Sequence, residues 1–167
     1  MKTVLFIGVV LIFGLNASAA LKPGDPAPDF NLPDSTGKMH ALSDYQGKIV
    51  ALYFYPKNDT PGCTAQACSL RDGFSLLEDD GVVVLGVSYD DVESHAQFKT
   101  KHNLNFTLLS DTSKATAKAY GADGMIFAKR MTYIIGPDGK ILHIIDKVDT
   151  RNHAQQIRDA LNRKDTE

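Results

Sequence analysis

Residues 49–71 read IVALYFYPKNDTPGCTAQACSLR, and this stretch decides how the rest of the chain is organised. Residues 49–55 form a continuous apolar run of the length expected for a strand that is buried on both faces. Prolines and a glycine between positions 56 and 62 then interrupt regular structure. From Cys63 onward, apolar residues recur at the three-and-four spacing of one helix face, namely Ala67, Leu70, Phe74 and Leu77. The stretch predicts a strand, a loop and a helix, with a cysteine at the helix N-terminus.

The remaining sequence continues the alternation of strands and helices. Residues 82–88, VVVLGVS, follow the helix and indicate a right-handed parallel crossover. Residues 131–145 predict an antiparallel hairpin with the turn GPDGK. The other predicted elements are a hairpin over 30–42, helices over 90–102, 110–119 and 152–162, and a strand over 106–109. We expect the helix that starts at Cys63 to end near Gly81. This order predicts one α/β domain of thioredoxin-like fold, with a central mixed sheet flanked by helices and an antiparallel edge.

The N-terminus has the three-part layout of a secretory signal. Lys2 precedes an apolar run from Val4 to Leu15, and small residues follow up to Ala20. The run is shorter than the roughly 20 residues that span a bilayer, so an uncleaved anchor is the weaker alternative. We expect cleavage after Ala19 or Ala20, which leaves residues 21–167 as a single exported, periplasmic domain without stable membrane association.

Composition excludes some classes of function. The formal net charge of the 167 residues is −2, and the lysines are scattered, so the sequence gives no basic patch for nucleic acid. His95 and His102 share a predicted helix face, but about 10 Å of helix separates them, too far for one metal ion without other ligands. We therefore expect neither a metal nor an organic cofactor.

The only two cysteines, Cys63 and Cys68, lie five positions apart. In a regular helix this spacing places the two Cα atoms roughly 8 to 9 Å apart, whereas a disulfide requires less than about 7 Å. The pair therefore cannot be bonded while the helix stays wound, which favours a cycling redox pair over a static disulfide. Two simply buried free thiols remain an alternative. On the helical wheel, Cys63 faces the apolar stripe and Cys68 lies on the other side.

The position of Cys63 suits nucleophilic chemistry. The reactive form of a cysteine is the thiolate, and free amide groups at a helix N-terminus favour a negative group. The same amides are placed to bind an incoming oxyanion or peroxide oxygen, and Thr60 is close enough in the loop to direct a hydroxyl to the same spot.

The pattern Pro56-x-x-x-Thr60-x-x-Cys63 resembles the active-site motif of peroxiredoxins, and residues 60–72, TPGCTAQACSLRD, resemble the bacterioferritin-comigratory, or PrxQ-type, subfamily. The resemblance implies a thiol peroxidase of the atypical two-cysteine kind. It implies that Cys63 is the peroxidatic cysteine, that Thr60 hydrogen-bonds the peroxide and that Pro56 shields the pocket. Arg130, in the context Arg-x-Thr-Tyr, matches the arginine that holds thiolate and peroxide.

The resemblance further implies that Cys68 is the resolving cysteine, which condenses with the Cys63 sulfenic acid to an intramolecular disulfide. The substrates would be hydrogen peroxide or alkyl hydroperoxides, and the reductant a thioredoxin-like dithiol protein. We expect a monomer or weak dimer. Asn58 stands where an aspartate is more usual, a difference expected to matter little. The signal is the larger departure, because an exported enzyme needs an electron source outside the cytosol.

Two other functions fit the composition less well. A periplasmic copper-handling thioredoxin-like protein would usually carry its cysteines four apart and near one face, whereas five positions diverge by about 140°. A general disulfide-exchange protein would more naturally use Cys-x-x-Cys.

Overall fold

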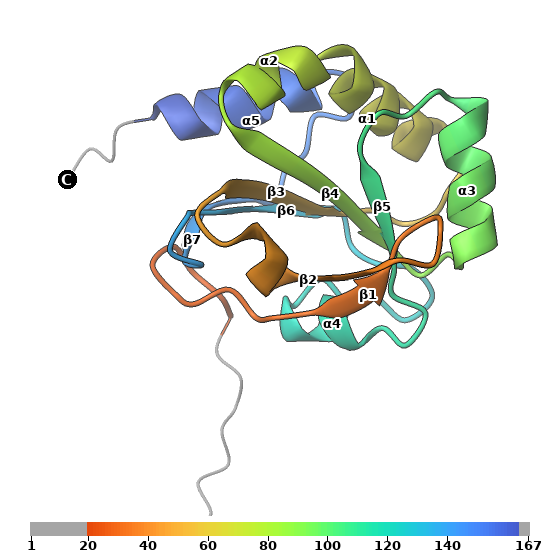
Figure 1. Cartoon of the computed structure of the whole chain (residues 1–167), viewed down its shortest axis with the longest axis horizontal. Coiled ribbons are helices and arrows are strands. Elements are labelled where there is room, and N and C mark those ends of the chain that lie inside the picture. The colour runs from red at the N-terminus through yellow and green to blue at the C-terminus, as the bar shows by residue number, and fades with distance from the viewer. Residues whose placement is uncertain (1–19, 164–167) are drawn as a thin grey trace, which may run out of the picture.

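The computed structural model describes residues 20–163, and these fold around one five-stranded sheet (Figure 1). The strand order is β5-β4-β3-β6-β7. The bounds are β3 Ile49–Phe54, β4 Val82–Ser88, β5 Thr107–Ser110, β6 Met131–Ile135 and β7 Ile141–Ile145. β3, β4 and β5 are parallel, whereas β6 and β7 are antiparallel to their neighbours. The predicted thioredoxin-like fold, with a mixed sheet and an antiparallel edge, is confirmed.

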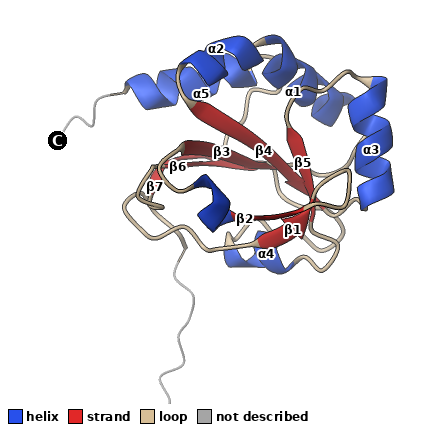
Figure 2. Ribbon diagram, in the orientation of Figure 1, coloured by secondary structure: helices blue, strands red, loops and turns tan. Residues whose placement is uncertain are grey.

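Helices and a small hairpin cover the two faces of the sheet (Figure 2). The helices are α1 Pro61–Asp72, α2 Phe74–Asp79, α3 Val92–Lys101, α4 Ala115–Ala119 and α5 His153–Asn162. In Figure 1, α1, α2 and α5 lie above the sheet, while α4 and the hairpin of β1 Asn31–Pro33 and β2 Met39–Ala41 lie below it. Each face of the sheet packs against its own hydrophobic core. Alternate residues of β3 belong to the two cores, with Ala51 and Tyr53 in one and Leu52 and Phe54 in the other. β3 is therefore buried on both faces, as its apolar run predicts.

The segment before β3 runs along the edge of the sheet. The Gly24 amide donates to the Ile141 carbonyl at 2.8 Å, and the Ala27 amide donates to the Gly139 carbonyl at 2.9 Å. The β1–β2 hairpin follows, and then a 3₁₀ helix, Leu42–Tyr45, leads into β3. This segment, which contains Pro23, Pro26 and Pro28, is thus held along the surface of the sheet by backbone hydrogen bonds.

The helix that follows the cysteine loop is broken in the middle, which the sequence does not predict. α1 ends at Asp72 and α2 begins at Phe74, and Gly73 between them has non-helical φ and ψ of −92° and 5°. Helix α5 approaches closely at this position, because a Cβ atom at Gly73 would lie 2.5 Å from the Ala154 Cβ atom. The prediction of one continuous helix from Cys63 to Gly81 is therefore wrong, although Gly81 does end the second helix with a positive φ of 74°.

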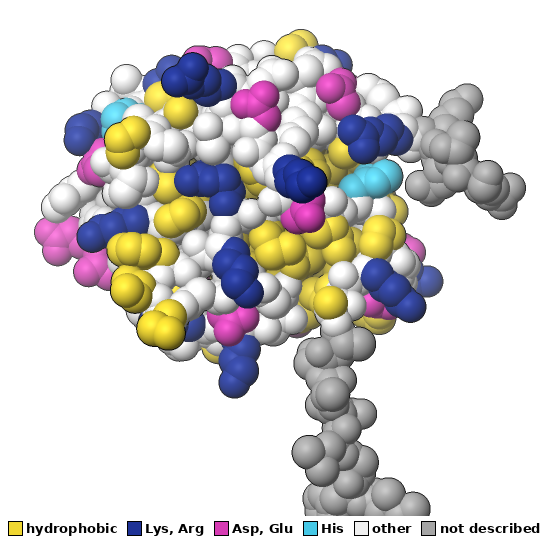
Figure 3. Space-filling model, turned by 180° about the vertical axis from the view of Figure 1, so that it is seen from behind, with side chains coloured by type: hydrophobic (Ala, Val, Ile, Leu, Met, Phe, Trp, Pro, Cys, Tyr) yellow, Lys and Arg dark blue, Asp and Glu magenta, His cyan; other side chains and the backbone are white. Residues whose placement is uncertain are grey.

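Two further observations concern the whole molecule. Within residues 20–163, no helix has both the length and the apolar character needed to cross a membrane. On the face seen in Figure 3, acidic and basic side chains are interspersed among hydrophobic ones. The predicted secretory signal falls almost entirely on residues 1–19, which lie outside the described residues.

Candidate active site

Both cysteines lie in α1, and they face in different directions. Cys63 is the third residue of the helix and is only 2% exposed, packed in the core with Ala67 and Leu70. Cys68 is half-buried, and both residues are free thiols. The predicted orientation, one sulfur toward the core and one away from it, is confirmed. Because both belong to one regular helix, their Cα atoms are held too far apart to bond.

Arg130 lies beside the Cys63 sulfur. Its Nη2 group donates to Cys63 Sγ at 3.3 Å, and its Nη1 group donates to the side-chain oxygen of Gln66, one turn further along α1. Arg130 immediately precedes β6, whose first residue, Met131, pairs with Phe54 at the end of β3. The antiparallel pairing therefore delivers the guanidinium to the loop that follows β3. A cation next to a helix N-terminus favours the thiolate form of a cysteine.

The structure gives Thr60 and Pro56 places in the same loop. Thr60 immediately precedes α1, and its carbonyl accepts the first helical hydrogen bond, from the Thr64 amide at 2.9 Å. Its hydroxyl donates to the Lys57 carbonyl at 3.0 Å. This bond uses the hydroxyl hydrogen and leaves oxygen lone pairs to accept a bond from a ligand. Pro56 is half-buried and lies two positions after Phe54, the last residue of β3.

Asn58 anchors the cysteine loop to α3 through contacts that the sequence does not reveal. It is buried, and its side-chain nitrogen donates to Ser94 Oγ at 2.9 Å and lies 3.2 Å from His95 Nδ1. Its side-chain oxygen accepts from the Tyr55 hydroxyl at 2.7 Å. An ionised aspartate has no donor for the first two contacts. An aspartate could not make the same set of contacts, so the asparagine defines how this loop is held against α3.

His95 takes part in the same anchor. Its Nε2 atom faces the Leu109 carbonyl at 3.2 Å, so this nitrogen carries the proton and Nδ1 accepts. Burial lowers the pKa of His95, against an opposing effect of the Asp90 charge. The imidazole is therefore neutral at physiological pH. His102, at the other end of α3, contacts Asp59 at 3.1 Å.

Tyr53 contributes a buried hydroxyl close to the thiol. Burial raises the pKa of Tyr53 well above its ordinary value, and the charge of Cys63 adds to the effect. Among the described residues, this hydroxyl is a buried side-chain group without a hydrogen-bond partner. The Tyr53 hydroxyl therefore stays protonated and neutral.

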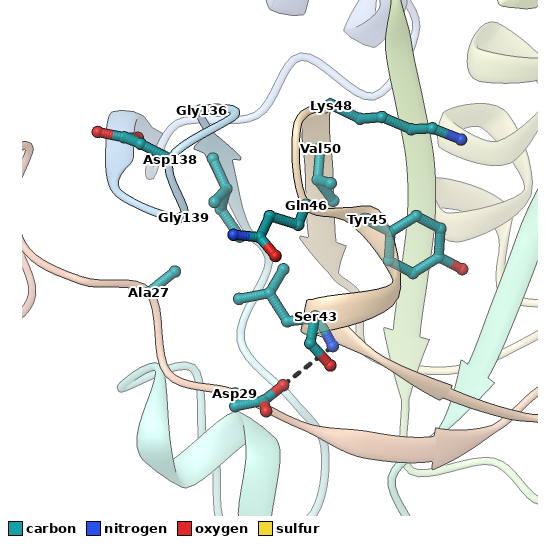
Figure 4. A pocket seen from close by; sticks show the side chains of 12 residues that line it. Ala27, Asp29, Ser43, Tyr45, Gln46, Lys48, Val50, Gly136, Asp138 and Gly139 are labelled. Atoms are coloured by element: carbon teal, nitrogen blue, oxygen red, sulfur yellow. Dashed lines mark hydrogen bonds between the residues drawn. The ribbon is translucent and has the colours of Figure 1, made fainter.

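A separate cavity lies at the other end of β3 (Figure 4). It has a volume of about 280 Å³, and its lining includes Asp29, Lys48, Val50 and Asp138. Asp29 already accepts a hydrogen bond from the Leu42 amide at 3.0 Å. Lys48 and Val50 are at the start of β3, whereas the cysteine loop follows its end, so this cavity is not part of the thiol site.

Known proteins share both this fold and this site region. The model of the AhpC/TSA family matches residues 23–144. Peroxiredoxin Bcp of Escherichia coli K12 is 46% identical over 141 residues, covering 80% of this chain and 90% of its own.

Solved structures of similar fold come from the same kind of protein. The crystal structure of peroxidoxin BcpB from Mycobacterium tuberculosis has a TM-score of 0.80 at 33% identity, covering 86% of this chain and 99% of that one. A structure of Xanthomonas campestris bacterioferritin comigratory protein, described as giving insight into its alkyl peroxide reduction activity, has a TM-score of 0.77 at 29% identity and covers 86% and 96%. The chain therefore belongs to the AhpC/TSA family and is a peroxiredoxin of the Bcp, or PrxQ, type.

Proposed function

We propose that this peroxidase reduces hydrogen peroxide and alkyl hydroperoxides through Cys63, with Cys68 as the resolving thiol and a thioredoxin-like dithiol protein as the reductant. The observation that carries the proposal is the hydrogen bond of 3.3 Å from Arg130 Nη2 to the buried Cys63 sulfur. It supports a thiolate in a low-dielectric site, where a charge-assisted hydrogen bond is strong. The alkyl peroxide activity described for the Xanthomonas relative supports the choice of substrates.

In the first step the Cys63 thiolate attacks one oxygen of the peroxide. An S–O bond forms and the O–O bond breaks, so the sulfur is oxidised to a sulfenic acid and the leaving oxygen takes a proton to become water or an alcohol. Arg130 and the α1 amides stabilise the negative charge that moves from sulfur to the leaving oxygen. The Thr60 oxygen accepts the hydrogen bond of the bound hydroperoxide.

In the second step the Cys68 thiolate attacks the Cys63 sulfenic sulfur. An S–S bond forms, the S–O bond breaks, and the leaving hydroxide takes up the proton that the Cys68 thiol released to become water. Because the wound helix holds the two thiols apart, α1 must unwind locally for this step. A dithiol protein then reduces the disulfide by exchange, and α1 rewinds.

Single-turnover oxidation tests the roles of the two cysteines. We expect Cys63→Ser to lose the rapid reaction with peroxide and Cys68→Ser to keep it. With a thioredoxin as the reductant, Cys68→Ser is expected to lose steady-state turnover. Native peroxide consumption by Cys63→Ser would disprove the peroxidatic role, and unchanged turnover by Cys68→Ser would remove the resolving role.

The place of action is a proposal of its own, based on the sequence of residues 1–20. We infer that these residues direct export and are removed, that the enzyme acts in the periplasm as a monomer or weak dimer, and that it draws electrons from an exported dithiol protein. N-terminal sequencing of the protein recovered from a periplasmic fraction is expected to begin near Leu21. Recovery of the full-length chain from the cytosol would contradict the proposal.

A further inference from the structure

His153 is a buried histidine that the proposed reaction does not use. It is the first residue of α5 and is completely buried, and both of its ring nitrogens have partners. Nδ1 lies 3.1 Å from Gln66 Nε2, and Nε2 lies 2.9 Å from Thr132 Oγ1. Burial lowers the pKa of His153 to about 3, with a further lowering by the Arg130 charge and a smaller opposing effect of Asp149. The ring is therefore neutral at physiological pH.

The contacts of Arg130 decide which nitrogen carries the proton. A guanidinium only donates hydrogen bonds, so the Gln66 atom that faces Arg130 must be the side-chain oxygen. The Gln66 side-chain nitrogen, which donates, then faces His153. Nδ1 of His153 must accept that bond, and the ring proton must sit on Nε2 and point at Thr132 Oγ1. Arg130 thus donates to both Cys63 and Gln66. Gln66 in turn donates to His153, and His153 donates to Thr132.

The surroundings of the ring hold it in this orientation. The Tyr53 ring meets it edge to face, with centroids 5.7 Å apart and planes at 83°. The next residue, Ala154, packs against Gly73 and donates its amide to Ser69 Oγ at 3.4 Å. The first turn of α5 is therefore docked on α1, the helix that holds Gln66.

We propose that His153 is a positioning residue for the peroxidase site: its unprotonated Nδ1 fixes the side-chain amide of Gln66, which in turn holds the Arg130 guanidinium against the Cys63 sulfur. Without this acceptor, the buried Gln66 nitrogen has no partner, so the side chain is held only by its bond to Arg130 and is free to shift away from the guanidinium. The guanidinium then loses its second anchor and contacts Cys63 for a smaller fraction of the time. The inference rests on the proposed roles of Cys63 and Arg130.

Three proteins test the inference, all in a Cys68→Ser background so that only one thiol reacts. They are the parent, His153→Leu and His153→Asn. Leucine fills the site without an acceptor, whereas the asparagine oxygen can occupy the place of Nδ1 and keep the bond to Gln66. The measurement is the single-turnover rate with hydrogen peroxide as a function of pH. We expect His153→Leu to lower the neutral rate about 3- to 10-fold, and its rate to rise only at higher pH. His153→Asn is expected to stay within about twofold of the parent.

A structural role would give a different result. If His153→Leu lowers the unfolding temperature but leaves the rate and its pH profile unchanged, the positioning role is overturned. If this variant does not fold, nitrogen-15 NMR of the wild-type imidazole gives the answer, because a proton on Nδ1 at neutral pH would contradict the arrangement. Cys63→Ser distinguishes failure of the proposed function from failure of the inference about His153. Full activity of Cys63→Ser would disprove the proposed function, whereas an unaffected His153→Leu would disprove only the inference.

Discussion

Arg130 Nη2 donates a hydrogen bond to Cys63 Sγ across 3.3 Å, although 67 positions separate the two residues. The register of β6 against β3, with Met131 opposite Phe54, produces this contact. The loop after β3 and the residue before β6 meet at the same end of the sheet. The site thus combines a nucleophile fixed by one helix with a cation that is placed by a strand pairing and also bonded to Gln66 of that helix.

Removing the guanidinium should therefore weaken the first chemical step. We expect Arg130→Met to slow the reaction of Cys63 with hydrogen peroxide about 10- to 100-fold, the range given by loss of a hydrogen bond to a charged group. Arg130→Lys should recover little, because a lysine cannot bond the thiolate and Gln66 together. The control is Arg158→Met. Arg158 belongs to α5 and pairs at the surface with Asp80. Equal rates for Arg130→Met and Arg158→Met would contradict the assignment.

Oxidation by one equivalent of peroxide should reduce helix content. The proposed disulfide joins two residues that the wound α1 keeps apart, so part of this 12-residue helix must open. Far-ultraviolet circular dichroism is expected to show a loss of helical signal that a dithiol reverses. Cys68→Ser provides the matched control, since it reacts with peroxide but cannot close the disulfide. The same loss of signal in that variant would assign the change to the sulfenic acid and not to the disulfide.

Gly73 should resist substitution. Its replacement by alanine brings two Cβ atoms to 2.5 Å, so we expect Gly73→Ala to lower the free energy of unfolding by about 1 to 3 kcal/mol. Adding Ala154→Gly removes the opposing atom and should return part of the loss. The control is Gly62→Ala, whose Cβ atom would meet Arg130 at an ordinary 3.4 Å. Urea denaturation gives the free energy of unfolding of the parent, Gly73→Ala, Ala154→Gly, the double variant and Gly62→Ala, and additive effects of the Gly73 and Ala154 changes would exclude the clash.

Stability should fall on acidification partly because of His153. Its pKa is 6.5 when exposed and about 3 when buried, so between these values the unfolded chain binds a proton that the folded chain does not. The contribution of the neutral ring is complete above pH 6.5 and is lost as the pH falls toward 3, by up to about 1.4 kcal/mol for each pH unit. His95 shifts in the same direction, so the comparison with His153→Asn isolates one histidine. Equal pH dependence in the two proteins would show that His153 is not the group responsible.

The sheet and the thiol helix were predictable because their signals are local. The apolar runs of β3 and β4 and the turn between β6 and β7 each lie within a few residues of sequence, and all three elements form where predicted. The need for glycine at position 73, between α1 and α2, has a different origin, since it depends on Ala154 of another helix. No local pattern distinguishes a glycine tolerated inside a helix from one that another helix requires.

The polar contacts of the site were harder to predict. Gln66 carried a weak signal, because it lies one helical turn after Cys63 and so on the same side of α1. His153 carried another, because it shares a helix face with Ile157 and Ala160, both buried. Neither signal identifies a partner, since Gln66 and His153 are 87 positions apart and meet only when α5 docks on α1.

Gln66 lies between Cys63 and Cys68 in α1, so if α1 opens to form the proposed disulfide, Gln66 leaves its place beside Arg130. Contacts from Gln66 to Arg130 and His153 stabilise only the wound, reduced form. By thermodynamic linkage, each interaction that strengthens this form makes the disulfide easier to reduce, and each that weakens it makes the disulfide persist. Gln66, Arg130 and His153, which hold the site around the Cys63 thiol, therefore also help to set the reduction potential of the enzyme. That potential decides which dithiol proteins are able to regenerate it.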